Sequence, residues 1–321
     1  MNDRAYIRKC WKLLKEINEM KSLNESERTQ IYSLREQYGL LHSETCTKKS
    51  LIETYKDFAP FFEKKYSRQK GRLRYVDFNQ GVDARLFTDE RVSLLSKIAV
   101  RPLRIAFDNI KTETAYTKAL NLSVEYGFKD FSNYLLYNFD DKPVDLYHRL
   151  RVNVDLCEKL NVSIYSFPMK YHPIRDEHSH DRDYIGIHWN RKYIRAVQAI
   201  LNATKGKVGR GLSFFEKAFG HDEEEYMELL IMPETFLLFR LFFEHLGYTQ
   251  KWREAMHELS DEEKIELYPI IFKNNFNNIE ELTSNEKFRY ILRFYKNYRA
   301  DIANHESDLY KLKKQFDEQN K

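Results

Sequence analysis

Four short apolar runs recur at nearly constant spacing, and this spacing restricts the possible folds more than any other feature of the chain. Their starts lie 28 to 31 residues apart; the runs are LRYVDF (73–78), LRIAF (103–107), FSNYLLY (131–137) and VSIYSF (162–167). That distance is the length of a strand followed by a helix and is too long for hairpins. Right-handed crossovers would make the four strands parallel neighbours with helices on the outside. The sequence therefore predicts an α/β fold, part of a barrel or of a doubly wound sheet.

The segments between these runs carry helix start and stop signals. Thr88 and Thr112 can cap the helices that follow the first two runs, and Gly127 ends the second helix. Pro143 lies in the first turn of a third helix, after Asp141. We therefore expect a partial (βα) barrel of about four parallel strands, flanked by helical regions on both sides.

The flanking regions have a helical pattern. Capping pairs occur at Asn24/Glu27, Ser260/Glu263 and Thr283/Glu286. We therefore expect three parts: an N-terminal helical segment at residues 1–70, a barrel-like region at 71–190 and a C-terminal helical domain at 191–321.

Charge and hydropathy exclude some classes of protein. The 53 basic and 49 acidic side chains leave a net charge of +4, so any surface that binds nucleic acid must be local. No apolar stretch approaches the roughly 20 residues that span a bilayer. The N-terminal stretch MNDRAYIRKCWKLLKEINEM is charged throughout and lacks the apolar core of a signal peptide. We therefore expect a cytoplasmic protein without a membrane partner.

Each of the four runs is followed by, or ends in, polar side chains. In parallel α/β folds the carboxyl ends of strands share one edge of the sheet, where active sites form. The polar set, strand by strand, is Asn79, Gln80, Asp83 and Arg85; Asp108 and Asn109; Asn138; and Ser166, Met169 and Lys170. The sequence predicts a polar pocket at this edge, with unrelated turns as the alternative.

The residue types restrict the ligand. Amides and carboxylates can bind ribose hydroxyls and an amino-acid zwitterion, and Arg85 or Lys170 can pair with a carboxylate. The sequence contains no GxGxxG or Walker pattern, so a phosphate-cradling loop is not expected. We also expect no metal site, because the spacing of His172, His178 and His180 matches no ligand pattern.

Several strings in order resemble the later strands of radical S-adenosylmethionine enzymes. The strings are FNQGVDARL, RIAFDN, NYLLYNFDDKP, IYSFPMKYHPI and GIHWNRKYIRAVQAILNATKGKVGRG, within residues 72–211, and they resemble a branch found in bacteria and phages. The resemblance implies a TIM-like barrel that binds S-adenosylmethionine at its C-terminal face. It would place Asn79, Gln80, Asp83, Arg85, Asp108, Asn109 and Asn138 around the cofactor, with Tyr165, Ser166 and Met169 near the adenine.

The chain departs from that family in its cysteines. The CxxxCxxC motif that ligates a [4Fe-4S] cluster in the family is absent, and Cys10, Cys46 and Cys157 are widely separated. The resemblance then implies that a separate chain supplies the cluster ligands and completes the barrel, with enzymatic activity only in that state. Two alternatives remain: a truncated or degenerate remnant, or a binding module whose open edge the N-terminal helices cover.

A second hypothesis is a non-enzymatic interaction or nucleic-acid-binding protein. Its candidate anion-binding residues belong to a basic helix and the loop KGKVGRG; they are Arg191, Lys192, Arg195, Lys205, Lys207 and Arg210. The alternative interpretation is a helix C-terminus followed by a solvated loop, where cations are also favoured. Aromatic runs such as FRYILRFYKNY are expected to be mostly core, with a stacking platform for bases as the other option.

Overall fold

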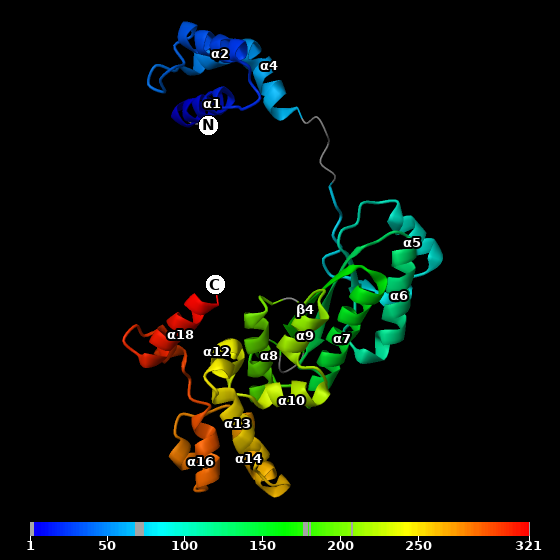
Figure 1. Cartoon of the computed structure of the whole chain (residues 1–321). Helices are drawn as coiled ribbons and strands as arrows, with labels where there is room; N and C mark the ends of the chain where they lie inside the picture. Colours follow the sequence, from blue (N-terminus) through cyan, green and yellow to red (C-terminus); the bar gives the residue numbers. More distant parts are fainter. Residues whose placement is uncertain (1–2, 68–73, 176–178, 180, 207, 321) are drawn as a thin grey trace. The chain divides into compact units, whose positions relative to one another are not determined.

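The chain folds into two compact units. The computed structural model describes residues 3–67, 74–175, 179, 181–206 and 208–320, drawn in Figure 1. One unit comprises Met1–Leu73, and the other comprises Arg74–Lys321. The second unit contains both the predicted sheet region and the predicted C-terminal helices.

The N-terminal unit is helical, as the sequence predicts for this region. Its helices are α1 (Asp3–Asn18), α2 (Glu25–Gln37), α3 (Lys48–Glu53) and α4 (Tyr55–Tyr66). Asn24 and Glu27 form the predicted capping box at the start of α2, since each side chain accepts the backbone N–H of the other residue. Residues from all four helices, including Leu14, Ile31 and Phe58, share one buried apolar cluster.

The second unit begins with a four-stranded parallel sheet, as predicted. The strands β1 (Val82–Asp83), β2 (Leu103–Ala106), β3 (Asp130–Tyr137) and β4 (Ser163–Lys170) lie in the order β1-β2-β3-β4. The elements between them are the short helices η1 (Ala84–Leu86) and η2 (Ile110–Thr112) and the helices α5 (Asp89–Ser96), α6 (Glu113–Glu125) and α7 (Pro143–Leu160). Among the described residues the sheet is open, with β1 and β4 at opposite edges.

The predicted first strand is in the wrong place. Residues 74–78 make only a single parallel bridge, between Val76 and Val100, and Leu73 lies outside the described residues. The strand itself, Val82–Asp83, comes after a turn in which Gly81 has φ +80° and donates its N–H to the Phe78 carbonyl at 2.8 Å. A positive φ suits glycine, so the amide-rich turn interrupts the apolar run before β1 begins.

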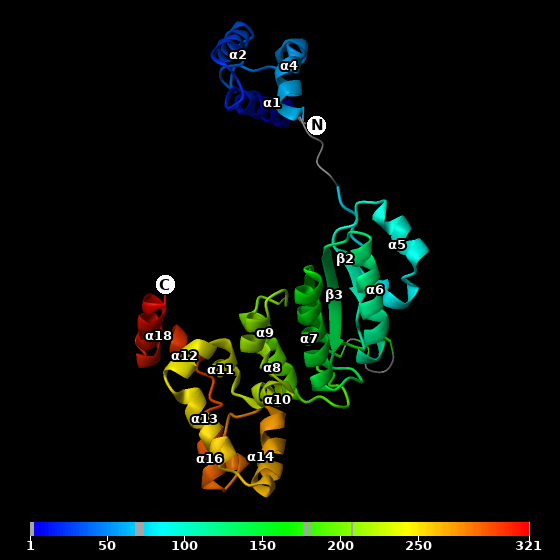
Figure 2. The same cartoon turned by 45° about the vertical axis from the view of Figure 1, so that its right-hand side comes forward.

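One face of the sheet is covered by helices α6 and α7, which lie along β2 and β3 in Figure 2. Tyr116 of α6 stacks on Phe107 at 4.3 Å between ring centroids and accepts a 2.8 Å hydrogen bond from Asn133. Asn153 of α7 donates to the Ser166 hydroxyl at 2.8 Å. Most polar groups on this face are therefore buried in hydrogen-bonded pairs, whereas Asn133 Oδ1 has no partner among the described residues.

The helices after residue 190 continue the same core. They are α8 (Arg191–Ala203), α9 (Leu212–Phe219), α10 (Glu223–Ile231), α11 (Glu234–Leu238), α12 (Arg240–His245), α13 (Tyr248–His257), α14 (Asp261–Lys273), α15 (Ile279–Leu282), α16 (Glu286–Arg293), α17 (Arg299–Ala303) and α18 (Asp308–Gln319). No helix in the described ranges has the length and apolar character needed to cross a bilayer.

Two local expectations for these helices have different outcomes. Ser260 and Glu263 form the predicted capping box of α14. The pair at Thr283 and Glu286 is wrong, because Asn285 caps α16 and accepts the N–H groups of residues 287 and 288. Asn285 is an equally good N-cap residue and lies closer to the helix.

Arg149 joins the carboxyl ends of the strands to α7. Its guanidinium is fully buried and donates to the backbone carbonyls of Asp108 and Leu136, at 2.8 Å each, and to that of Asp145 at 3.1 Å. It also forms an ion pair of 3.1 Å with the Asp141 carboxylate. One side chain thus links β2, β3 and the helix that follows them.

Replacing Arg149 should therefore destabilise the second unit strongly. Arg149→Met removes the donor to four backbone carbonyls and the ion-pair partner of the buried Asp141 carboxylate, and we expect a loss of about 3 kcal/mol or more in the free energy of unfolding by urea. Arg151→Met on the same helix is the control, since Arg151 is partly exposed, and should cost less than about 1 kcal/mol. Equal losses for the two variants would contradict this role for Arg149.

Candidate functional site

The first polar group at the edge of the sheet is an ion pair. Asp83 ends β1, and its carboxylate accepts from the Arg85 guanidinium at 2.6 to 3.1 Å. The Arg85 side chain and backbone N–H together lower the pKa of Asp83 to about 2. Asn79 and Gln80, expected beside them at a strand end, instead lie exposed in the turn before β1. They lie there because the turn at Gly81 ends the apolar run before β1 begins at Val82.

Asp108 and Asn109 follow β2 at the predicted edge. The Asn109 side chain accepts the Lys111 N–H at 2.9 Å and caps η2. The Asp108 backbone carbonyl is held by Arg149, while its carboxyl group has a raised pKa because nearby protein atoms displace water. Asp108 therefore offers a carboxyl group at this edge.

Asn138 is a structural clamp. Its amide donates to the Tyr184 carbonyl at 3.0 Å, and its Oδ1 accepts the Gly186 N–H at 2.9 Å. A Cβ at Gly186 would lie 2.2 Å from the Phe139 carbonyl oxygen, so this loop packs directly on the end of β3. Asn138 is fully buried, and both of its polar ends are committed to holding that loop.

The residues of β4 divide between the two faces of the sheet. Ser166 is 1% exposed and faces the helices, where its hydroxyl accepts a hydrogen bond from the Asn153 amide. Tyr165 and Met169 lie on the other face and are 44% and 46% exposed. Lys170 ends the strand and donates to the Arg182 carbonyl at 2.8 Å. Strand β4 continues to Lys170, so Tyr165 and Ser166 lie within it rather than at its end.

The described residues of the second unit cover the other face of the sheet only partly. Side chains alternate between the faces of a strand, and register places Arg104 beside Ser132, Ser132 beside Tyr165, and Tyr134 beside Phe167. The open face, as we call it, comprises Arg104, Ala106, Ser132, Tyr134, Leu136, Tyr165, Phe167 and Met169. Most of these side chains are half-exposed or exposed, which is unusual for a parallel sheet.

Two polar side chains on the open face have buried atoms without a hydrogen-bond partner among the described residues. Arg104 is 7% exposed, and its Nε and Nη1 atoms have no hydrogen-bond partner among the residues that the structure describes. Its Nη2 lies 3.2 Å from Asp77, and its guanidinium lies over the Tyr134 ring at 4.8 Å. The hydroxyl of Ser132, its neighbour in register, is 3% exposed and equally unpartnered in the described part of the chain. Buried donors in this state are costly and suggest a missing acceptor.

Arg104, Ser132 and Tyr134 were not among the site residues predicted from the sequence. A signal was present, because Arg104 and Ser132 are polar residues inside apolar runs and are spaced by one strand–helix repeat. Only the register, however, shows that they are neighbours on one face.

The predicted anion-binding residues do not form one basic surface. Lys192 is fully buried, Arg195 pairs with Glu234 at 2.8 Å, and Arg210 pairs with Glu158 at 3.3 Å. Arg191 lies 3.7 Å from Asp183. Lys205 is exposed, and Lys207 lies outside the described residues, as do His178 and His180. The loop is attached to the sheet edge by the pair of hydrogen bonds between Val208 and Ser166.

The buried Lys192 should make stability depend on pH. Its ammonium donates to the Met232 carbonyl at 2.5 Å, and burial lowers its pKa to about 7, partly opposed by Glu234. An unfolded lysine keeps its proton up to about pH 10. Between about pH 7 and pH 10 the unfolded chain binds more protons than the folded chain. The free energy of unfolding therefore rises with pH by up to about 1.4 kcal/mol per pH unit in this range. Below pH 7 both states keep the proton, and Lys192 adds no pH dependence.

Lys192→Met should remove this slope. We expect the difference in unfolding free energy between the wild type and the variant to shift in favour of the wild type as pH rises from neutral towards 10. Urea titrations across that window provide the measurement. Lys251→Met, at an exposed lysine of α13, is the control and should leave the slope unchanged. A parallel pH profile for wild type and Lys192→Met would contradict the prediction.

The three cysteines belong to different parts of the chain. Cys10 and Cys46 belong to the N-terminal unit, while Cys157 is buried on α7. Burial raises the pKa of the Cys157 thiol, whose sulfur accepts the Ile164 N–H at 3.3 Å. No group of three or more metal-ligating side chains occurs within the described ranges.

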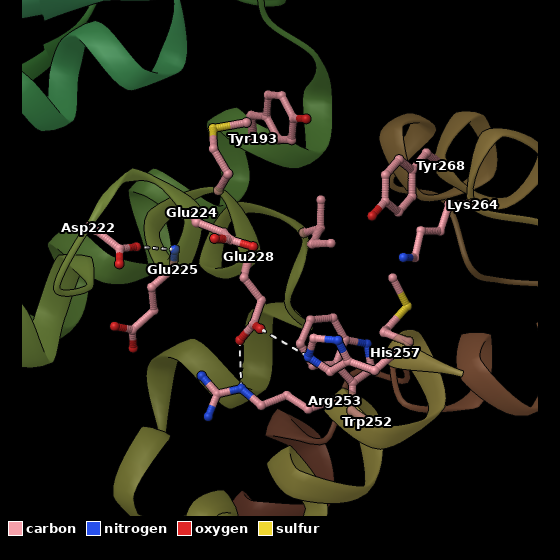
Figure 3. Close-up of a pocket in the computed structure, with 13 residues that line it drawn as sticks. Tyr193, Asp222, Glu224, Glu225, Glu228, Trp252, Arg253, His257, Lys264 and Tyr268 are labelled. Atoms are coloured by element: carbon pink, nitrogen blue, oxygen red, sulfur yellow. Dashed lines mark hydrogen bonds and ion pairs between the residues drawn. The ribbon is translucent and has the colours of Figure 1, made fainter. Parts of the chain in front are cut away.

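A separate pocket of about 550 Å³ lies among α8, α10, α13 and α14, outside the predicted site (Figure 3). Glu228 lies near its centre and pairs with Arg253 at 2.6 Å and with His257 at 4.0 Å. Lys264 and Tyr268 line the opposite side. Because acidic and basic groups are mixed and largely paired, this pocket selects no single class of ligand.

Comparisons with protein-family models, with curated proteins and with solved structures found no match for the chain.

Proposed function

We propose that the α/β region is the ligand-binding part of a radical S-adenosylmethionine-type (βα) barrel. In this proposal it binds S-adenosylmethionine along the open face and the carboxyl edge of the sheet. It becomes an enzyme only when a separate chain supplies the [4Fe-4S] ligands and completes the barrel. The observation that carries the proposal is the open face, where Arg104 Nε and Nη1 and the Ser132 hydroxyl have no hydrogen-bond partner among the described residues.

The architecture supports a barrel-type site. A parallel sheet is normally covered on both faces, whereas here α6 and α7 cover one face and the other keeps exposed and half-exposed aromatic side chains. In a (βα) barrel the helices lie outside and the second face lines the interior. The open edge at β1 is where further strands would add.

The residues on the open face suit the parts of S-adenosylmethionine. The free donors of Arg104 and the Ser132 hydroxyl would hold the carboxylate of its amino-acid part. Tyr134 and Phe167, 5.9 Å apart between ring centroids, offer aromatic surface to the adenine. Asp108 at the edge would accept hydrogen bonds from the ammonium group or the ribose hydroxyls. Bound S-adenosylmethionine supplies radical chemistry when a cluster gives it an electron.

The cluster itself does not fit this chain. In this chain Cys10 lies on α1, Cys46 precedes α3 and Cys157 lies on α7. Cys157, the cysteine of the α/β region, is buried, and burial raises the pKa of its thiol. Iron ligation needs accessible thiolates grouped at one place. We derive no reaction step through a cluster and assign its ligands to the partner chain. Free cysteines also support our proposal of a reducing, cytoplasmic location.

Calorimetry with S-adenosylmethionine tests the ligand. We expect the full-length protein to bind it, and Arg104→Gln to weaken binding about tenfold or more, because a charge-assisted contact is lost. Arg101→Gln is the matched control, since Arg101 precedes the same strand but pairs with Asp130 at 2.9 Å on the surface. If the wild type shows no heat of binding, or if Arg104→Gln binds S-adenosylmethionine as tightly as the wild type, the proposed binding site is wrong.

Iron and sulfide analysis tests the need for a second chain. After anaerobic reconstitution of this chain alone, we expect no stoichiometric cluster, because its thiols are dispersed. The control is a Cys157→Ala variant, which should behave like the wild type. A full complement of iron and sulfide bound to this chain would overturn the proposed division of labour.

A further inference from the structure

A second cavity, of about 750 Å³, lies within the C-terminal helices and is distinct from the open face. Its walls are formed by α8, the start of α11, the segment 274–279 after α14, and residues 293–299 at the end of α16 and beyond. The volume falls within the range of small-molecule sites. Nothing in the proposed function uses this cavity.

The lining of this cavity is strongly basic. Four cationic side chains, Arg195, Arg293, Lys296 and Arg299, line it together with a single carboxylate, Glu234. The four cations are 45% to 62% exposed, so they can reach a ligand without unfolding the core. A cavity with this excess of cations attracts anions.

Glu234 organises two of these cations. It accepts from Arg195 at 2.8 Å and from Arg299 at 2.6 Å, which fixes both guanidinium groups at one wall. Arg293 and Lys296 have looser partners on the surface, Glu280 at 3.8 Å and Asp301 at 3.1 Å. Solvent screening makes such exposed pairs weak, so an anion can compete for these cations.

Amides and aromatic rings complete the lining. Asn275 and Asn297 accept backbone N–H groups with their side-chain oxygens, at 3.4 and 3.1 Å, so their NH₂ groups are what they can offer a ligand. Phe276 and Tyr298 also line the cavity. Donor groups beside aromatic surface suit a ligand that joins phosphate to a flat ring.

We propose that this cavity binds a phosphate-bearing small molecule of the nucleotide class. Arginine and lysine would hold the phosphates, and the aromatic side chains would contact the base. The cations converge on one cavity instead of forming a stripe across the surface, and the net charge of the chain is only +4. Both features favour a small ligand over a length of nucleic acid.

Equilibrium dialysis of the full-length protein with radiolabelled ATP at low ionic strength tests this site. We expect saturable binding that pyrophosphate reduces and adenosine does not. Arg293→Ala/Lys296→Ala should weaken binding about tenfold or more, since two charge-assisted contacts are lost. Glu234→Gln should strengthen binding several-fold, because it removes the competing negative charge from the wall.

The matched control is Lys205→Ala/Arg210→Ala, two cations of the KGKVGRG loop outside the cavity, which should leave ATP binding unchanged. Circular dichroism melts should show that all variants remain folded, because the substituted cations are exposed and Glu234→Gln keeps the size of a partly exposed side chain. The proposal is overturned if ATP does not bind, if adenosine binds equally well, or if the loop variant alone loses binding. Tighter binding of a short single-stranded RNA that depends on the same cations would also overturn it, in favour of a nucleic-acid site.

Discussion

The buried guanidinium of Arg149 holds together the part of the molecule on which the candidate site depends. It joins the ends of β2 and β3 to α7 through four backbone carbonyls and the Asp141 carboxylate. A fully buried charge is tolerated only when its hydrogen bonds are satisfied, so these contacts must form together. The Trp189 indole donates to the Asp141 carbonyl at 2.8 Å and ties the loop before α8 to the same point.

This arrangement separates polar residues that build the fold from those that remain available. Asn138 holds a loop, Asp83 and Arg85 satisfy each other, and Ser166 belongs to the covered face. On the open face, by contrast, Arg104 Nε and Nη1 and the Ser132 hydroxyl lack hydrogen-bond partners among the described residues, although Arg104 Nη2 pairs with Asp77. Polar residues at strand ends are thus not all site residues, because a parallel sheet must also anchor its own loops.

The strand–helix alternation could be predicted because it rests on local periodicity. Periodicity predicted the first strand in the wrong place. The apolar run at residues 73–78 ends at the Asn79–Gly81 turn, and the strand begins only after that turn. Arg104 and Ser132 stand out in sequence only as polar residues inside apolar runs, and they become neighbours only through the register of β2 and β3. The basic cavity was equally out of reach, because Arg195 and Arg299 meet at Glu234 from helices about 100 residues apart.

The sequence by itself determined the order of strands and helices and the polar character of the strand ends, since both follow from local hydrophobic pattern and turn chemistry. It also determined the separation of the cysteines along the chain. Tertiary structure decided which polar groups pair with one another, which face of the sheet stays open and where the cations gather. Those outcomes depend on contacts between residues far apart in the chain, and packing and desolvation choose among them only after the elements have formed.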